Sequence, residues 1–263
     1  NTIAVLIAGI AGVLLMYTVY RSLPDSADGK LDLLKTMKIM LKYGLPISIG
    51  AIITGFLTQF YGIIMPIFVT DNALIGNYSV ATNFVVLITF FATPVTTMML
   101  PAFSKLDFRR DQEILQNVFQ YSVKYAALIV VPVATMVMAL SQPAIGTIFG
   151  DSYLHAPLFL ALLSITYLLS SLGSLSIGNL INSQGDTKYN LKLAILQASV
   201  GFPLSFFMIS QFGIIGLIIT TIIVAMPGLF LSVGFIKKRY QVSLDWKSSA
   251  KILVSSSVTA ILT

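Results

Sequence analysis

The ionisable side chains of this chain are too few and too scattered for catalysis. There is one histidine, His155, and no cysteine, so neither a histidine cluster nor a thiolate metal site can form. The sequence has no carboxylate pair placed for general acid–base chemistry, no nucleophile beside a base and no glycine-rich phosphate loop. We therefore expect no catalytic residue, no metal, no cofactor and no enzyme activity.

Uncharged polar side chains inside apolar stretches are better candidates for a binding site. Gln59 is the only side-chain amide in the interior of its stretch. An unpaired amide in hydrocarbon is costly, so Gln59 must face protein or a wet cavity. With Gln59, the side chains of Tyr61, Tyr78 and Asn83 would offer donors and acceptors for sugar hydroxyls and aromatic faces for sugar rings. A hydrogen bond to a neighbouring helix is the alternative role for each of them.

These residues lie in a predicted transmembrane hairpin over residues 45–101. Two apolar arms of roughly 20 to 25 residues are joined by a polar turn at Asp71, and helices of that length cross about 30 Å of hydrocarbon. Each arm has one small or polar stripe on a helical wheel, and a third stripe runs along the span predicted at 156–181 and ends one residue beyond it. The stripes are Ser48, Gly55, Gln59, Gly62 and Pro66; Tyr78, Thr82, Thr89, Thr93 and Thr96; and Ser164, Tyr167, Ser171, Ser174, Gly178 and Asn182. For the third stripe, close helix packing and cavity lining both stay open.

The composition is that of an all-α membrane protein. Hydrophobic residues make up 56% of the chain and charged residues 10%, with a mean hydropathy of +0.89, which leaves too little polar surface for a soluble globule. We predict a polytopic transmembrane helix bundle with about seven complete spans and a truncated eighth. The spans are expected near 2–20, 45–69, 74–101, 121–142, 156–181, 191–211 and 213–235, with the truncated one from about 251.

The basic residues predict the orientation in the membrane. All 16 Lys and Arg residues fall in the connections 21–44, 102–124, 182–192 and 236–251. The opposite connections, at 70–73, 143–155 and the turn near Gly213, contain none. Basic residues in short loops mark the cytoplasmic face, so we expect a cell-membrane protein with the turns at Asp71 and Asp151 outside. This placement also explains the net charge of +6 without a nucleic-acid partner.

Two of the basic connections have amphipathic spacing. Residues 30–43 and 104–120 are each typical of a helix lying on the inner leaflet. In the second, Arg109 and Arg110 either help to fix the orientation or contact an anionic lipid or pyrophosphate headgroup at the inner mouth of a transport path.

Several short motifs resemble those of a known transporter family. They are GLP at 44–46, NALIGNYSVA at 72–81, LPAFS at 100–104 after Pro94, LSQP at 140–143, IFGDSY at 148–153 followed by Ala156, and LINSQGDTK at 180–188. In this order and spacing they cover nearly the whole chain, which resembles the C-terminal half of a polysaccharide biosynthesis flippase. Such flippases share a superfamily with multidrug and toxin extrusion transporters.

The resemblance implies two six-helix lobes around a central cavity, with alternating access moving a lipid-linked sugar outward. Residues 1–20 would be the last helix of the N-terminal lobe, 21–44 a cytoplasmic linker with an amphipathic helix, 45–235 the C-terminal lobe, and 236–263 a cytoplasmic loop and the start of an additional helix. The implied partners are the lipid-linked sugar, membrane lipids, the missing N-terminal lobe and, still open, a coupling ion. Charged cavity residues expected of the family are absent from these spans.

Three other function classes stay open at this point. A drug or metabolite antiporter of the same superfamily shares the expected fold. An integral-membrane polysaccharide polymerase or glycosyltransferase would need a large acid-bearing outer loop, which the sequence lacks. A non-transporting scaffold would not need three polar stripes or prolines inside five spans; these prolines are Pro66, Pro94, Pro132, Pro203 and Pro227.

Overall fold

A computed structural model describes Thr18, residues 33–150 and residues 152–262. The regular structure of these residues is helical: α2 (Leu33–Phe68), α3 (Asn72–Ser104), α4 (Gln112–Ala139), α5 (Ser141–Phe149), α6 (Ala156–Leu168), the 3-10 helix η1 (Leu169–Leu172), α7 (Ser174–Ser183), α8 (Thr187–Tyr240) and α9 (Trp246–Leu262). The predicted span 2–20 except Thr18, the linker up to residue 32 and Asp151 lie outside the described residues. The chain divides into two units, Asn1–Leu41 and Lys42–Thr263. The described residues of the first unit are Thr18 and the first turns of α2, and the second unit contains the rest of α2 and α3 to α9.

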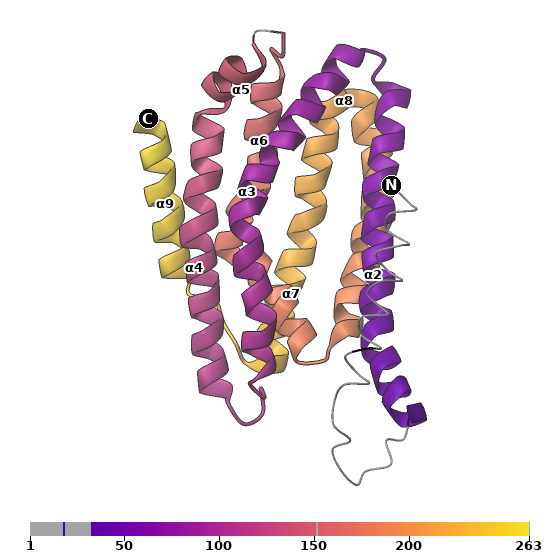
Figure 1. Ribbon diagram of the computed structural model, residues 1–263, viewed down its shortest axis with the longest axis vertical. Helices are drawn as coiled ribbons and strands as arrows, with labels where there is room; N and C mark the ends of the chain where they lie inside the picture. The colour runs from indigo at the N-terminus through magenta and orange to yellow at the C-terminus, as the bar shows by residue number, and fades with distance from the viewer. Residues whose placement is uncertain (1–17, 19–32, 151, 263) are drawn as a thin grey trace. The chain divides into compact units, whose positions relative to one another are not determined.

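The predicted hairpin is formed by α2 and α3 (Figure 1). Asp71 caps α3, because its Oδ1 accepts a hydrogen bond from the Ala73 N–H at 2.8 Å. Helix α2 runs from Leu33 to Phe68. It therefore joins two segments that were predicted separately, the amphipathic helix at residues 30–43 and the first hairpin arm. This helix packs on α8 through Phe60 and Phe202, whose ring centroids are 4.7 Å apart.

The prediction of one surface helix over residues 104–120 was wrong for its first half, because only residues 112–120 continue as helix and they belong to α4. Helix α3 ends at Ser104, α4 begins at Gln112, and the residues between them form a turn. Two carboxylates hold this turn: Asp107 Oδ1 accepts from the Arg109 N–H at 2.9 Å, and Asp111 Oδ2 accepts from the Asp107 N–H at 3.0 Å. Aspartates that bind nearby backbone N–H groups compete with helix formation, and this competition explains the break.

The span predicted over residues 156–181 is broken in the middle. Helices α6 and α7 meet at an angle of 51° across Gly173, whose φ of +83° is left-handed. A Cβ at this position would also lie 3.2 Å from Leu244 Cδ2, so both the backbone and the space favour glycine. The hydroxyls of Ser170 and Ser176, on either side of the break, are buried without a hydrogen-bond partner among the described residues.

Helix α8 is two arms rather than one rod. Its 54 residues would be about 80 Å long if straight, far more than a bilayer is thick. Gly213, with φ 57° and ψ −134°, lies at the turn between the arms, as the sequence predicts, and the arms run beside each other in Figure 1. Helix α5 begins at Ser141 and fills the first part of the connection predicted at 143–155, which the sequence analysis did not anticipate.

An extended strap, residues 241–245, joins α8 to α9 and passes behind the lower part of α4 in Figure 1. Val242 and Leu244 point into the core and are 0% and 6% exposed. The side chain of Gln116 binds the peptide groups of Ser243 at both ends, accepting from its N–H at 2.7 Å and donating to its C=O at 3.0 Å. Gln112, one turn away, donates to Gln241 Oε1 at 2.7 Å.

The surface and the helix lengths are those of a multi-pass membrane protein. By length and composition α3, α4, α8 and the stretch Lys35–Phe68 could each cross a membrane, and the bent α6–α7 pair could be a fifth crossing among the described residues. Large apolar side chains face outward, with Ile52 69%, Phe90 71% and Met98 71% exposed. Such a surface is stable in lipid but not in water. Inside, one apolar cluster surrounds Phe103 and Phe119, and a second surrounds Ile64 and Leu160 near the α2–α3 turn.

Candidate functional site

The polar stripe predicted on α2 lies on a face of the helix that none of the described residues covers. Ser48, Gly55, Gln59, Gly62 and Pro66 are all exposed. Gln59 forms no side-chain hydrogen bond with any described residue, so the interhelical bond considered as its alternative role is not made within this part of the chain. The amide is therefore free for water or for a partner outside the described residues.

The other three predicted cavity residues are not gathered around Gln59 in one pocket. Asn83 is exposed on α3, and it too makes no side-chain hydrogen bond with a described residue. Tyr61 and Tyr78 are half-buried and pack against the apolar cluster near the α2–α3 turn. The Tyr61 hydroxyl lies close to the backbone of α8, since a Cβ on Gly201 would be 2.9 Å from it.

The threonines of the α3 stripe satisfy their own hydroxyl groups. Each donates to a carbonyl one turn earlier in α3; for example, Thr93 Oγ1 donates to Thr89 O at 2.7 Å and Thr89 Oγ1 to Val86 O at 2.8 Å. These hydroxyls therefore do not hold α3 to another helix, and their remaining lone pairs can accept from water or a ligand.

A cavity of about 400 Å³, with several polar side chains in a largely apolar wall, lies elsewhere, between α2, the bent α6–α7 pair and the two arms of α8. We call it the amide cavity, after three carboxamides in its wall: Asn182, Asn190 and Gln197. Hydroxyls of Thr54, Thr166, Ser174 and Ser232 complete the polar part of the lining. The wall contains no ionisable side chain and none of the four predicted cavity residues.

The carboxamides of the amide cavity differ in how far they are paired. Asn190 Nδ2 donates to Asn182 Oδ1 at 2.7 Å and to Gly178 O at 3.2 Å. Gln197, in contrast, has no side-chain hydrogen bond with a described residue. Its amide faces the opposite arm of α8, where a Cβ on Gly228 would be only 2.9 Å from Nε2, so the glycine leaves room for it.

Sequence reasoning missed most of this cavity. Ser174, Gly178 and Asn182 belong to the third predicted stripe, for which cavity lining was one of two open roles. Gln197 carries the signal that singled out Gln59, a lone amide in an apolar stretch, and the same rule would have found it.

Arg109 and Arg110 lie exposed in the turn between α3 and α4. The Arg109 guanidinium sits 5.4 Å from the centre of the Phe108 ring, and the Arg239 guanidinium 5.5 Å from the same ring. These contacts place Arg109 at the same end of the helices as the end of α8.

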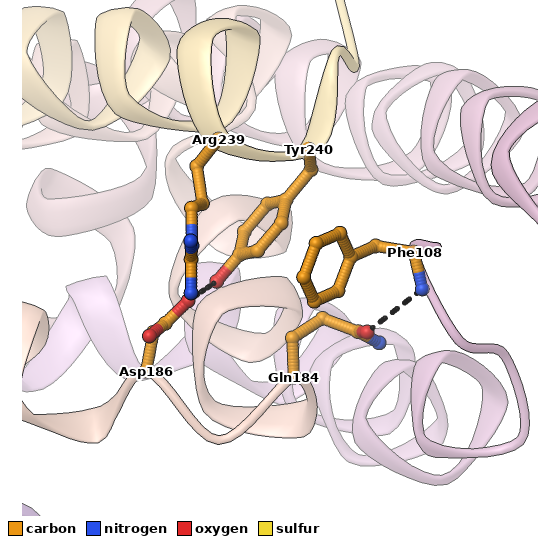
Figure 2. Close-up of polar contacts among 5 residues, drawn as sticks. All are labelled: Phe108, Gln184, Asp186, Arg239 and Tyr240. Atoms are coloured by element: carbon orange, nitrogen blue, oxygen red, sulfur yellow. Dashed lines mark hydrogen bonds and ion pairs between the residues drawn. The ribbon is translucent and has the colours of Figure 1, made fainter. Parts of the chain in front are cut away.

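A clamp of polar contacts ties three connections together at this end. Figure 2 shows Asp186, in the α7–α8 turn, accepting from the Tyr240 hydroxyl at 2.7 Å and pairing with Arg239 Nε at 3.3 Å. Gln184 accepts from the Phe108 N–H at 3.3 Å. Burial, and then the bond to Asp186, raise the pKa of Tyr240, so its hydroxyl stays protonated as a donor. The contacts are those of a structural clamp rather than a reactive site.

The described residues offer no metal centre, because no three or more His, Cys, Asp or Glu side chains gather among them. What the arrangement can do is bind: it presents uncharged donors and acceptors on α2, on α3 and in the amide cavity, with cationic groups at one end.

Comparison with known proteins points to one family. A profile for the family described as polysaccharide biosynthesis protein matches residues 2–158. An uncharacterized membrane protein of Methanocaldococcus jannaschii, MJ1068, is 27% identical over 191 residues, covering 72% of this chain and 37% of the relative. The probable low-salt glycan biosynthesis flippase Agl15 of Haloferax volcanii is 21% identical over 220 residues, covering 83% of this chain and 45% of the relative. The chain thus spans less than half the length of these curated relatives.

Two solved structures share the fold. One is an outward-facing multidrug resistance transporter of the MATE family in the MOP superfamily, with a TM-score of 0.67 and 15% identity. The other is a MOP superfamily transporter from Pyrococcus furiosus, with a TM-score of 0.68 and 14% identity. In both cases the similarity covers 85% of this chain and 52% of the other.

Proposed function

Because this chain belongs to the polysaccharide biosynthesis protein family, with the fold of MOP superfamily transporters, we propose that it forms one lobe of a membrane flippase. The flippase moves lipid-linked oligosaccharide or polysaccharide precursors to the outer face by alternating access. The flippase name of one relative and the matching half of two transporter structures support this function.

The helices can be counted as a six-span lobe. Helices α2, α3 and α4, the broken α6–α7 pair and the two arms of α8 supply the spans of the lobe proposed for residues 45–235. Helix α9 is then the additional helix after the loop, residues 1–20 the last helix of the other lobe, and 21–44 the linker between lobes. With the helix proposed for residues 1–20 and with α9, this count agrees with the span pattern predicted above.

The observation that carries the proposal is the uncovered polar face of α2. An apolar helix that exposes Gln59 and two glycines on one side would be poorly placed against lipid tails, because the amide would have no partner there. A water-filled cavity facing a second lobe provides one. Gln59, Tyr61, Tyr78 and Asn83 are the proposed substrate-lining residues on the hairpin.

The remaining parts of the proposal concern orientation and partners. The lobe sits in the cell membrane with its basic connections in the cytoplasm and the turns at Asp71 and Asp151 outside. Arg109 and Arg110 contact anionic lipid or the headgroup of the substrate at the inner mouth. The partners are the lipid-linked sugar, membrane lipids and the N-terminal lobe, together with any coupling ion bound there.

A complementation experiment tests the function. In cells lacking their polysaccharide flippase, the complete two-lobe protein should restore export, whereas residues 1–263 alone should insert into the membrane without restoring it, since a single lobe cannot enclose a cavity. Export by the isolated chain would contradict the one-lobe proposal. If the complete protein gave resistance to cationic drugs but no polysaccharide export, the antiporter alternative would be favoured. The fold similarity to a multidrug resistance transporter is the reason to include this test.

A further inference from the structure

We propose that the amide cavity is a binding site for an uncharged, hydrogen-bonding group of the substrate, such as the hydroxyl and acetamido groups of one or two sugar units. The proposal rests on the proposed function for the identity of the ligand. It adds a subsite inside this lobe, separate from the uncovered faces of α2 and α3.

The first support is the set of polar atoms left without partners in the cavity wall. Gln197 has both its carbonyl oxygen and its NH₂ group free among the described residues. Asn190 uses its NH₂ group, and Asn182 accepts with its side-chain oxygen, so Asn190 keeps an acceptor and Asn182 keeps a donor. These side chains are half-buried, so water meets their unpaired atoms in the free protein, and a ligand that carries hydroxyl groups can replace that water.

The second support is the absence of charge. Every residue that lines the cavity is neutral, so a phosphate placed inside would lose its hydration without gaining a counter-charge. A neutral sugar loses far less on the same transfer and regains its hydrogen bonds from the carboxamides. The charged part of a lipid-linked sugar would find positive partners at the end of the helices, where the guanidinium groups of Arg109 and Arg239 lie.

The third support is the position and size of the cavity. Asn182 and Asn190 flank the α7–α8 turn at the clamped end, and Gln197 lies two turns further along α8, about 10 Å deeper. A volume of about 400 Å³ falls in the range of small-ligand sites, which is roughly 300 to 1,000 Å³. Ordered water is the competing occupant, because a cavity of this size with several polar groups in its wall is not left dry.

Gly178 allows the cavity to be blocked without disturbing its wall. A Cβ at this position would meet nothing within 4 Å, so Gly178→Leu should fill open space rather than clash. Gly234, on the second arm of α8 and outside the cavity, is equally open and makes Gly234→Leu the matched control. Gln197→Leu removes the unpaired amide, and Gln211→Leu, an exposed glutamine in the same helix, controls for it.

The test measures binding of N,N′-diacetylchitobiose, a neutral disaccharide, to the complete protein in lipid nanodiscs by titration calorimetry. Gly178→Leu and Gln197→Leu should each weaken binding by about tenfold or more, as expected for lost hydrogen bonds and lost space, while the two controls stay within about twofold. Glucose 1-phosphate, with its charge, should not compete for the site. Thermal unfolding of each variant shows whether it is folded. Because two different variants test the same cavity, the result still holds if one of them fails to fold.

Several outcomes would overturn the proposal. If Gly178→Leu bound the disaccharide as tightly as the parent protein, the sugar would bind outside the amide cavity. If the parent protein exported polysaccharide but bound no disaccharide, the cavity would hold only water. These failures leave the proposed function standing. Conversely, sugar binding that Gly178→Leu abolishes, in a protein that exports no polysaccharide, would support the cavity and contradict the function.

Discussion

Gln59 and Gln197 are both single carboxamides in long apolar helices, yet their surroundings differ. Gln59 lies exposed on α2, whereas Gln197 is half-buried between the two arms of α8, with Gly228 opposite. Neither makes a side-chain hydrogen bond with a described residue, so the fold does not depend on either amide. Their polarity is therefore best explained by contact with water or a ligand.

Replacing Gln59 by leucine should reduce transport by the complete protein while leaving its abundance and thermal stability nearly unchanged. The leucine fills a similar volume, and no hydrogen bond within the lobe is lost. Export assays and melting curves of the purified protein measure the two effects. Gln211→Leu, an exposed glutamine of α8, is the control and should change neither quantity. Abundance and export falling together would mark Gln59 as a packing residue.

Asn77 is a polar residue that the fold does depend on. It is 4% exposed, and its Oδ1 accepts from the backbone N–H groups of His155 and Ala156 at 3.0 and 2.9 Å, so a residue of α3 caps the start of α6. Asn77→Ala should lower the free energy of unfolding by about 1–3 kcal/mol, because the buried N–H of Ala156 and the part-buried N–H of His155 both lose their acceptor. Denaturant unfolding in detergent measures the loss. Asn83→Ala, an exposed residue of the same helix, should change it by less than about 0.5 kcal/mol; equal effects would refute the capping role.

Helices and turns that depend on their own residues could be predicted from the sequence. Features that depend on contacts with distant parts of the chain could not. Hydropathy predicts the two hairpin arms, and the polar turn at Asp71 and the glycine at 213 end helices through their own backbone preferences. The break at Gly173 is different, because the space that favours glycine there is limited in part by Leu244, 71 residues further along the chain. The amide cavity likewise escaped prediction, since its wall comes from helices that are far apart in sequence.

The strap shows how a distant contact of this kind is held. It alternates buried Val242 and Leu244 with Ser243, which the α4 side chains bind from outside. Gln112, Gln116 and Gln120 recur every four residues, so they form one row along α4 facing the strap. The row fixes Leu244 against Gly173 and so supports the break in the α6–α7 span.

Gln116→Leu should loosen the strap without unfolding the lobe. It removes two hydrogen bonds to the Ser243 peptide groups, worth about 1 kcal/mol together at this exposed site, which corresponds to roughly fivefold faster amide exchange. Hydrogen–deuterium exchange of peptides covering residues 241–245 measures the change. Gln120→Leu loses only one bond of 3.4 Å and should have a smaller effect. Unchanged exchange in Gln116→Leu would show that Val242 and Leu244 hold the strap by themselves.

At the scale of the second unit, the polar clamp brings basic connections to one end. The α3–α4 turn, the α7–α8 turn and the end of α8 meet through Phe108, Asp186 and Arg239. The sequence groups the same three connections on one side of the membrane from their Lys and Arg residues alone. The distribution of Lys and Arg and the contacts of the clamp thus place the same three connections together. This agreement supports the number of crossings between them, because one missing or extra crossing would put two of these connections at opposite ends of the helices.

Sidedness itself can be measured with single cysteines, for which this chain is well suited because it contains none. Cysteines replacing Asn72 and Ser152 should react with an impermeant thiol reagent added to intact cells. Those replacing Lys105 and Lys237 should react only after the membrane is opened, because basic connections stay in the cytoplasm. All four positions are exposed, so a failure to react reports the membrane rather than burial. The reversed pattern would place the basic end outside, and labelling of all four in intact cells would refute the arrangement of crossings; either result would remove the basis for an inner mouth at Arg109 and Arg110.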